Sequence, residues 1–184
     1  MKEETCIILD FLRSGYPDRR HAEPIAQALG TEFFTLLEII PRDDAELAQE
    51  EEIYIGKEKR DKVKFIRGSI EYRDLTNMAK NLLPEVIEKI IREKEKKFVD
   101  FFNTSRMLTP RMHQIQLLPG IGKKHLLDIL EERRKKPFES LTDLGQRIHL
   151  VPEPVKILTR RVLQELEGNE KYYLFTAAKR VERA

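Results

Sequence analysis

"LLPGIGKKHLLDIL", Leu117 to Leu130, places a proline, two glycines and two lysines between two apolar runs. Pro119 and Gly120 suit the end of one helical segment, because they allow the chain to reverse sharply. Gly122 has no side chain that would keep a ligand away from the backbone of the next segment. The stretch therefore predicts a tight turn that leads directly into a helix.

Two lysines at the start of that helix are unexpected. The N–H groups of a first helical turn lack partners and carry a partial positive charge, so a cation there costs about 0.3–1 kcal/mol. Lys123 and Lys124 become favourable only if an anion binds between them and the N–H groups. A phosphate site and an ordinary turn with exposed lysines both fit this stretch. The glycine spacing excludes a mononucleotide P-loop and a dinucleotide fingerprint.

Short helices are predicted on both sides of the turn. Before it, "TPRMHQIQLL" has Thr109 as N-cap and Pro110 as first helical residue. After it come the helical stretches "KKHLLDILEERRKK", "ESLTDLGQRI" and "EPVKILTRRVLQELEG", the last closed by Gly168. Helices joined by such short loops predict a compact all-α domain over residues 105–184.

The segments that precede this domain change period. Short apolar runs separated by polar turns, "TCIILDFL", "EEIYIG" and "VKFIRGSIEY", predict a small β-barrel or meander over residues 1–75. "EFFTLLEII" is ambiguous between strand and helix. Apolar residues at helical spacing from Leu83 to Phe102, with Pro84 in the first turn, predict connecting amphipathic helices over 76–104. The expected fold class is α+β.

From about Ile115 to Leu144 the chain resembles the helix-hairpin-helix motif of DNA repair, recombination and RNA-associated proteins. The resemblance implies that main-chain N–H groups at Gly120 and Gly122, beside Ile121, contact a phosphate together with Lys123 and Lys124. It also implies a monovalent cation, the one cofactor considered, held by main-chain carbonyls. Here those carbonyls would belong to Gln116, Leu118 and Ile121.

A second hairpin of the tandem kind departs from that pattern. "HLVPEPVKIL" has Pro152, Glu153 and Pro154 where another Gly-x-Gly is expected. Bulky prolines and an acid would repel phosphate, so this half is predicted to be structural. Lys156, Arg160 and Arg161 fit either added backbone contacts or ordinary charges on a helix surface.

Over its whole length the chain resembles an uncharacterised, mostly archaeal family of small proteins expected to bind nucleic acid. The stretches that carry this resemblance include "GYPDRR", "EEIYIGKEKRDKV" and "YRDLTNMAKNLLPEVIEKII". It implies an N-terminal barrel resembling an OB-fold and a C-terminal helix-hairpin-helix domain. Members are often encoded near genes for translation and ribosomal-RNA maturation, which favours RNA over DNA as the partner.

One hairpin of the expected barrel is rich in basic residues. OB-folds bind single strands with basic grooves and stacked aromatic side chains, so this hairpin is a candidate second nucleic-acid contact. A buried Phe65 beside a solubilising edge of lysines is the equally open alternative. The basic residues are Lys57, Lys59, Arg60, Lys62, Lys64 and Arg67.

Composition narrows the class of protein further. The chain has 34 basic and 32 acidic residues, of which 18 and 22 fall in residues 1–104, so its C-terminal part is net basic. This asymmetry favours a polyanion as partner of that part. One cysteine, no signal-peptide pattern and no apolar run long enough for a membrane span predict a cytoplasmic protein without a membrane partner.

No constellation of catalytic residues stands out. The four histidines are scattered, and the acidic runs Asp43–Asp44 and Glu50–Glu52 fit solvated loops. We therefore expect a non-enzymatic protein that binds RNA or DNA by its phosphate backbone. A module that docks on a ribonucleoprotein or polymerase-like partner is the alternative.

Overall fold

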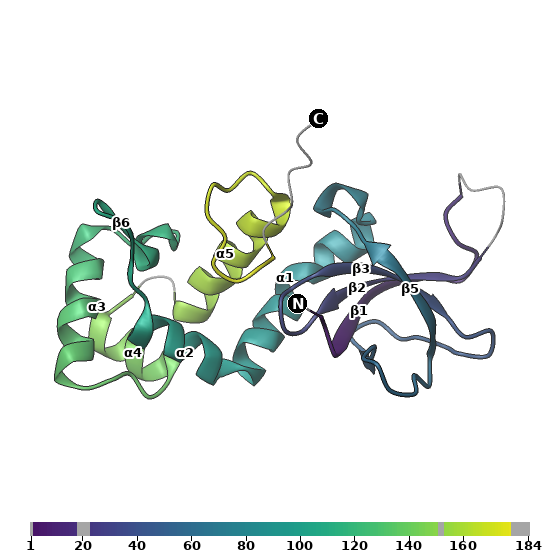
Figure 1. Cartoon of the computed structure of the whole chain (residues 1–184), viewed down its shortest axis with the longest axis horizontal. Coiled ribbons are helices and arrows are strands. Elements are labelled where there is room, and N and C mark those ends of the chain that lie inside the picture. The colour runs from purple at the N-terminus through teal and green to yellow at the C-terminus, as the bar shows by residue number, and fades with distance from the viewer. Residues whose placement is uncertain (1, 18–22, 151–152, 178–184) are drawn as a thin grey trace. The chain divides into compact units, whose positions relative to one another are not determined.

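The computed structural model describes residues 2–17, 23–150 and 153–177 (Figure 1). The chain divides into two compact units, one formed by Met1–Val86 with Glu165–Ala184 and the other by Ile87–Gln164. The class is mixed α+β, as expected. The first unit is built on an antiparallel sheet, and the second is mostly helical.

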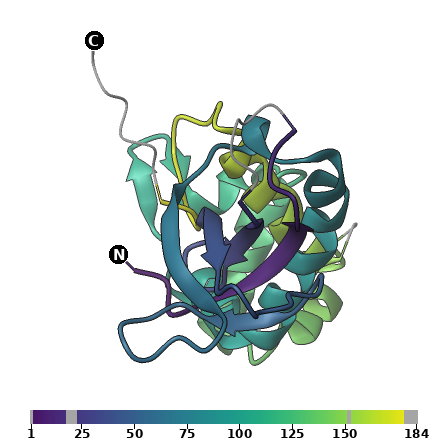
Figure 2. The ribbon, with the colours of Figure 1, turned by 90° about the vertical axis from the view of Figure 1, so that its right-hand side faces the viewer.

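Five antiparallel strands curl into a half-barrel in the first unit (Figure 2). The strand order is β4-β1-β2-β3-β5, so β4 and β5 form the two edges. This confirms the predicted small β-structure. The second half of the ambiguous "EFFTLLEII", from Leu36, forms strand β3, whereas residues 32–35 precede the strand. The strands are β1 (Thr5–Leu12), β2 (Ile25–Gly30), β3 (Leu36–Pro41), β4 (Glu52–Tyr54) and β5 (Val63–Ser69).

Strand β2 was not predicted from the sequence. Its residues, "IAQALG", include alanine, glutamine and glycine, which have low β-propensity. All six are nevertheless buried, because both faces of the strand are covered. Ala26 and Ala28 pack in the cluster inside the curl of the sheet, together with Cys6, Ile8 and Ile39.

The other face of β2 holds the start of helix α1 (Asn77–Glu93). Gln27 is fully buried, and its side-chain amide donates to the Asp74 carbonyl at 2.9 Å and accepts from Thr76 N–H at 2.8 Å. The Thr76 hydroxyl accepts from Ala79 N–H at 3.1 Å and donates to Asp10 at 2.7 Å. One buried amide thus fixes where α1 begins on the sheet.

Helix α1 corrects one sequence expectation. Pro84 lies inside the helix and not in its first turn, because Thr76 caps the helix more than one turn earlier. The apolar stripe predicted from Leu83 to Phe102 is also interrupted. Lys94 leaves helical geometry with φ −105° and ψ 31°, and a separate helix α2 (Glu95–Thr104) follows.

Short elements lead to the turn in the second unit. These are β6 (Met107–Thr109), β7 (Met112–His113) and the 3₁₀ helix η2 (Gln114–Leu117). The helix predicted to begin at Pro110 is therefore wrong. Pro110 lies in the tight turn that joins β6 to β7, where its restricted φ is equally suitable.

Three further helices agree with the predicted ones. They are α3 (Lys123–Lys135), α4 (Leu141–Ile148) and α5 (Pro154–Glu167). Gly168 has φ 87°, the left-handed conformation expected of a residue that ends a helix. Arg147 of α4 donates to the carbonyls of Glu132 and Lys136 at the end of α3, at 2.7 and 2.9 Å. Two carbonyls at the C-terminal end of α3 are therefore satisfied by a side chain of the same unit.

The buried Gln27 amide gives a test of this fold. Gln27→Leu roughly keeps the volume but removes the side-chain partner of the Thr76 N–H and of the Asp74 carbonyl, and one donor to the Tyr16 hydroxyl. We expect it to lower the free energy of unfolding by roughly 2–4 kcal/mol, measured by urea denaturation. Gln49→Leu removes one bond from an exposed glutamine and serves as control. Equal losses in both variants would contradict the role of Gln27.

Candidate functional site

The turn between η2 and α3 is closed by one hydrogen bond. Ile121 N–H donates to the Leu118 carbonyl at 3.1 Å, so Pro119 and Gly120 are the two central residues. Gly120 has φ +84°, the value of the second central residue of a type II turn, which glycine adopts without strain. Ile121 is 6% exposed and packs inward, as its apolar character suggests.

Gly122 is the N-cap of α3, with φ −87° and ψ −176°. Any L-residue adopts this extended conformation, and a Cβ added at Gly122 would meet no atom within 4 Å. The fold therefore does not require glycine here, in contrast to the left-handed Gly120. A glycine at this position leaves the backbone at the helix end open to an approaching group.

The first turn of α3 is uncapped and positively charged. Gly122 provides no side-chain cap, and the turn contains no acidic residue. Lys123 and Lys124 are exposed and form no ion pair within the described part of the chain. The free N–H groups and both ammonium groups thus occupy one helix end, where an anion would be stabilised by each of them.

Buried polar groups hold the segment that enters the turn. Arg161 of α5 is 2% exposed and donates to the Leu117 carbonyl at 3.2 Å. The imidazole of His113, 3% exposed, accepts from Ile115 N–H at 3.2 Å through Nδ1 and so caps η2. Both expectations for Arg161 are therefore wrong. Its side chain is neither a charge on the helix surface nor available to the backbone of a nucleic acid, because it is buried and supports the turn from inside.

The protonation state of His113 decides whether its side chain can cap η2. Burial lowers the pKa of His113 below its ordinary value, and the positive charge of Arg133 lowers it further. Arg133 itself is fixed by hydrogen bonds to the carbonyls of Phe102 and Ser105, at 2.9 and 3.1 Å. The neutral imidazole is therefore the form compatible with the cap, because a proton on Nδ1 removes the acceptor.

The other two basic residues considered for the second half of the domain, Lys156 and Arg160, lie on the surface of α5. Lys156 forms an ion pair with Glu88, whereas Arg160 is exposed. Pro152, where the glycines of a second hairpin are missing, lies outside the described residues. Glu153 and Pro154 follow directly, and Pro154 begins α5.

The three carbonyl groups considered for a monovalent cation lie within six consecutive residues that end with the turn. Gln116 lies in η2, and Leu118 and Ile121 are the first and last residues of the closing turn. The Leu118 oxygen already accepts the hydrogen bond from Ile121 and has one further lone pair. In the described chain, no group of three or more His, Cys, Asp or Glu side chains could hold a metal ion.

The basic residues predicted on the barrel belong to the other unit, and three of the six form ion pairs. Lys62 forms an ion pair with Glu51, and Lys64 lies 3.2 Å from Asp43. Arg67 pairs with Glu23 and lies 4.0 Å from Glu38. Strand β5 is thus an edge whose positive charges are largely balanced by the same unit.

The predicted hairpin is wrong, because β4 pairs with β1 and β5 with β3 at opposite edges of the sheet. The segment that connects β4 to β5 is more open. Arg60 donates to the Gly56 carbonyl at 2.8 Å, whereas Lys57 and Lys59 are exposed without an ion pair among the described residues. Phe65 is 42% exposed, so the alternative that placed it in the core is wrong. An exposed aromatic ring on an edge strand remains compatible with stacking on a base.

Sequence reasoning missed the length of the acid-free stretch around the turn. From residue 101 to residue 127 the chain has no Asp or Glu, although these make up 32 of its 184 residues. The stretch contains Arg106 and Arg111 besides the two lysines, and neither arginine forms an ion pair within the described part of the chain. A count of acids along the chain would have located this region.

The family model described as "Protein of unknown function (DUF655)" matches residues 2–177. The chain belongs to this family. Another DUF655 protein, Af1531 from Archaeoglobus fulgidus, has a crystal structure that matches with 46% sequence identity and a TM-score of 0.88. The match covers 95% of this chain and all of that one.

A second similar protein also comes from an archaeon. "Uncharacterized protein MJ0038" of Methanocaldococcus jannaschii is 42% identical over 175 residues, which is 94% of this chain and 79% of the relative. The sequence resemblance to an uncharacterised family with archaeal members is confirmed to this extent. Among the described helices, none is both long and apolar enough to cross a membrane.

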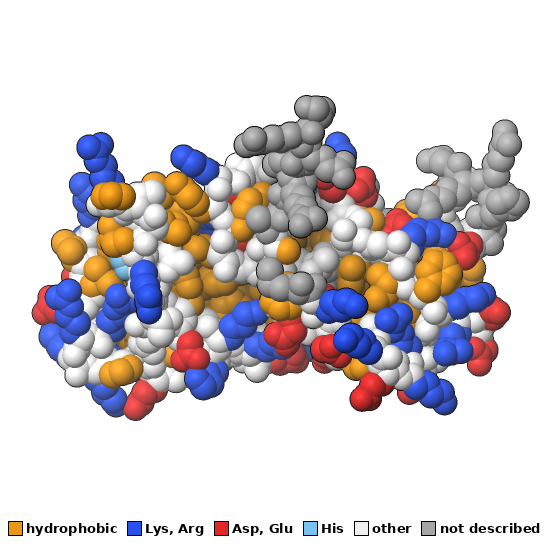
Figure 3. All heavy atoms as spheres, viewed as in Figure 1, with side chains coloured by type: hydrophobic (Ala, Val, Ile, Leu, Met, Phe, Trp, Pro, Cys, Tyr) orange, Lys and Arg blue, Asp and Glu red, His pale blue; other side chains and the backbone are white. Residues whose placement is uncertain are grey.

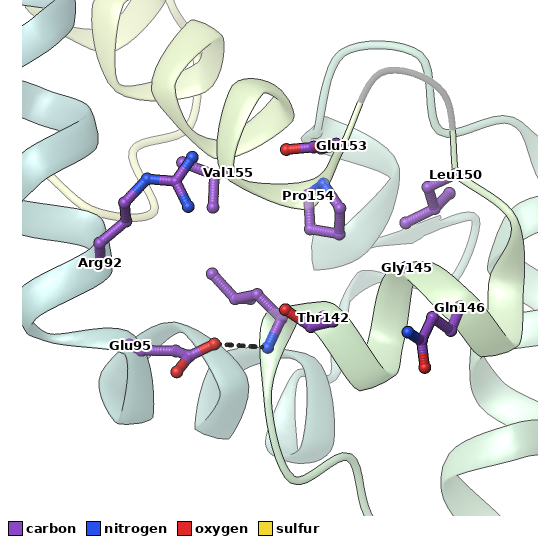
Figure 4. A pocket seen from close by; sticks show the side chains of 10 residues that line it. Arg92, Glu95, Thr142, Gly145, Gln146, Leu150, Glu153, Pro154 and Val155 are labelled. Atoms are coloured by element: carbon purple, nitrogen blue, oxygen red, sulfur yellow. Dashed lines mark hydrogen bonds between the residues drawn. The ribbon is translucent and has the colours of Figure 1, made fainter.

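An open pocket of about 570 Å³ lies elsewhere in the second unit, against helices α4 and α5 (Figure 4). Its polar side chains include Arg92, Glu95, Thr142 and Gln146. Glu95 is already used in the fold, since its carboxylate accepts from Leu141 N–H at 2.8 Å at the start of α4. The pocket therefore offers fewer free polar groups than its lining suggests.

The two glycines of the turn should respond differently to substitution. Gly120→Ala forces a Cβ into a left-handed conformation and should lower the free energy of unfolding by about 1–2 kcal/mol. Gly122→Ser adds a capping hydroxyl in a compatible conformation and should raise it by about 0.5–1 kcal/mol. Urea denaturation measures both. Destabilisation by Gly122→Ser would show that the fold itself needs glycine there.

His113 predicts a pH dependence. The unfolded state has a histidine pKa of about 6.5 and the folded state a lower one, so the unfolded state binds more protons between the two values. The stabilisation is thus complete above about pH 6.5 and is lost as the pH falls toward the folded pKa. We expect thermal melts of His113→Asn, which retains a capping acceptor, to lose less stability on acidification than the wild type. Identical pH profiles would contradict the assignment.

Proposed function

We propose that this protein binds nucleic acid, without enzymatic activity, by holding backbone phosphates at the turn that begins α3. The observation that carries the proposal is Gly122, a glycine in an ordinary conformation with open space where its side chain would be. Beside it lie uncapped N–H groups and the exposed side chains of Lys123 and Lys124. Such contacts recognise phosphate without reading sequence.

The resemblance to the helix-hairpin-helix motif supports the same assignment. In that motif the hairpin glycines bring main-chain N–H groups against the phosphate. The order 3₁₀ helix, type II turn and helix found from Gln114 to Lys135 is compatible with it. A monovalent cation at the carbonyls of Gln116, Leu118 and Ile121 would add positive charge at the same place.

We assign the principal contact to this turn and a secondary one to the first unit. Its curled sheet supports the resemblance to an OB-fold, and Lys57 and Lys59 remain available for phosphate. Phe65 offers a ring for stacking. The intramolecular ion pairs of Lys62, Lys64 and Arg67 argue for a weaker contribution from β5.

RNA is the favoured partner in this proposal, in translation or ribosomal-RNA maturation, because the resembling family is often encoded near such genes. The alternative is a module that docks on a protein of a ribonucleoprotein or polymerase. Its support would be the exposed apolar side chains near the turn, such as Leu127, which is 65% exposed. Salt dependence separates the two, since phosphate contacts release counterions and most protein contacts release far fewer.

Charge reversal at the turn is the direct test. Lys123→Glu combined with Lys124→Glu should weaken binding of RNA and DNA duplexes by roughly tenfold or more at low salt. The slope of log affinity against log salt should fall by about 1 for each phosphate that the variant no longer neutralises. Fluorescence anisotropy with labelled oligonucleotides between about 50 and 200 mM salt measures both quantities.

Lys96→Glu with Lys97→Glu is the control for net charge, because it makes the same change on the exposed side of α2, where Lys96 also loses its ion pair with Asp100. It should change affinity by less than about threefold, since long-range charge alone is screened. Equal effects of the two double variants, or no binding by the wild type at low salt, would contradict the proposed phosphate site. Gly122→Ser should weaken binding while it stabilises the fold.

A further inference from the structure

The β6–β7 hairpin exposes two apolar side chains that are neighbours in sequence, at a point where the strand pairing shifts register between Met107 and Thr109. Met107 is 55% exposed and Leu108 is 36% exposed, in a chain where few large hydrophobic side chains of the described residues are exposed at all. No other two of these are neighbours in sequence. A partner that covered this methionine and leucine would remove apolar surface from water, which favours binding.

Arginines flank this apolar pair on the same hairpin. Arg106 precedes Met107 and Arg111 lies in the tight turn, and both side chains are exposed without an ion pair in the described residues. The hairpin lies in the acid-free stretch of residues 101–127, which also contains Lys123 and Lys124. Basic and hydrophobic side chains are seen together over β6 and α3 in Figure 3.

Hydrogen bonds fix the β6–β7 hairpin to the segment that leads into the turn between η2 and α3. Arg106 N–H donates to the Gln114 side chain at 2.8 Å, and Gln114 N–H donates to the Arg106 carbonyl at 3.0 Å. Arg133 of α3 donates to the Ser105 carbonyl at the base of the hairpin, at 3.1 Å. Since Gln114 begins η2, which leads into the turn, hairpin and turn form one continuous piece of structure.

We propose, building on the phosphate-binding function above, that the Arg106–Met112 hairpin contacts the same nucleic acid and packs Met107 and Leu108 against an unstacked base. The exposed cations of this stretch complement phosphate, which identifies the occupant as nucleic acid. Apolar side chains bury little apolar surface against phosphates or the polar edges of the grooves. In a continuous duplex the faces of the bases are covered by their stacked neighbours. Proteins insert methionine and leucine between base steps at the cost of unstacking them, and a base that is already unstacked removes that cost.

The preferred substrate is therefore a duplex with a discontinuity. The turn at α3 grips the backbone of the paired region, while the hairpin covers an unpaired base that protrudes from the duplex at a bulge. This assigns a structural class of nucleic acid and no particular sequence. It also accounts for an exposed apolar pair placed among basic side chains.

A bulged duplex and its continuous counterpart test the assignment. Both are RNA stems closed by the same stable loop at each end, and one carries an extra unpaired adenine run. We expect the wild type to prefer the bulged stem, and Met107→Ser with Leu108→Ser to weaken its binding by roughly tenfold while changing the continuous stem less than about twofold. Met78→Ser, at a methionine 55% exposed in the other unit, is the control.

The outcomes separate this inference from the function on which it rests. If the hairpin variant leaves the preference unchanged while Lys123→Glu with Lys124→Glu abolishes binding, the phosphate site stands and the hairpin assignment is wrong. If the wild type binds neither stem, nor the DNA duplexes of the charge-reversal test, at low salt, both are wrong. A hairpin variant that loses both stems equally also overturns the assignment, and circular dichroism melts confirm that each variant is folded.

Discussion

The hydrogen bond from Ile121 N–H to the Leu118 carbonyl determines how the candidate site is built. In the type II geometry that closes this bond, Gly120 is left-handed and the apolar Ile121 is brought inward, so that the chain leaves the turn at Gly122 and enters α3 at once. The uncapped N–H groups and the two lysines then lie at one helix end. A residue other than glycine at position 120 would strain this arrangement.

The charges of the two units are organised differently. In the first unit, basic side chains on and near β5 are matched by Glu51, Asp43 and Glu23, so the sheet edge is balanced by its own acids. In the second unit, the stretch of residues 101–127 has no acid at all, and its cations remain without ion pairs among the described residues. A local arrangement that is unfavourable without a ligand is typical of a functional site.

Much of the fold follows from patterns that can be recognised in the sequence. The apolar run of β1, the glycine that ends α5 and the helical period of α3 and α4 all agree with the structure. The failures have local causes. Strand β2 is made of weak strand formers and exists because both of its faces are covered, and Pro110 suits a hairpin turn as well as a helix start. The spacing of apolar residues along the chain indicates neither the burial of β2 nor the choice of a hairpin turn at Pro110.

By itself, the sequence determined the turn at Pro119–Gly120, the basic start of α3 and the α+β class, because these depend on backbone preferences and spacing along the chain. Only the tertiary structure decided which charges are free. Arg161 looked like a surface charge and is a buried support of Leu117, while Lys62 and Lys64 looked available and are paired with acids distant in sequence. Burial and ion pairing depend on contacts between segments far apart in the chain, and those contacts exist only once the chain has folded.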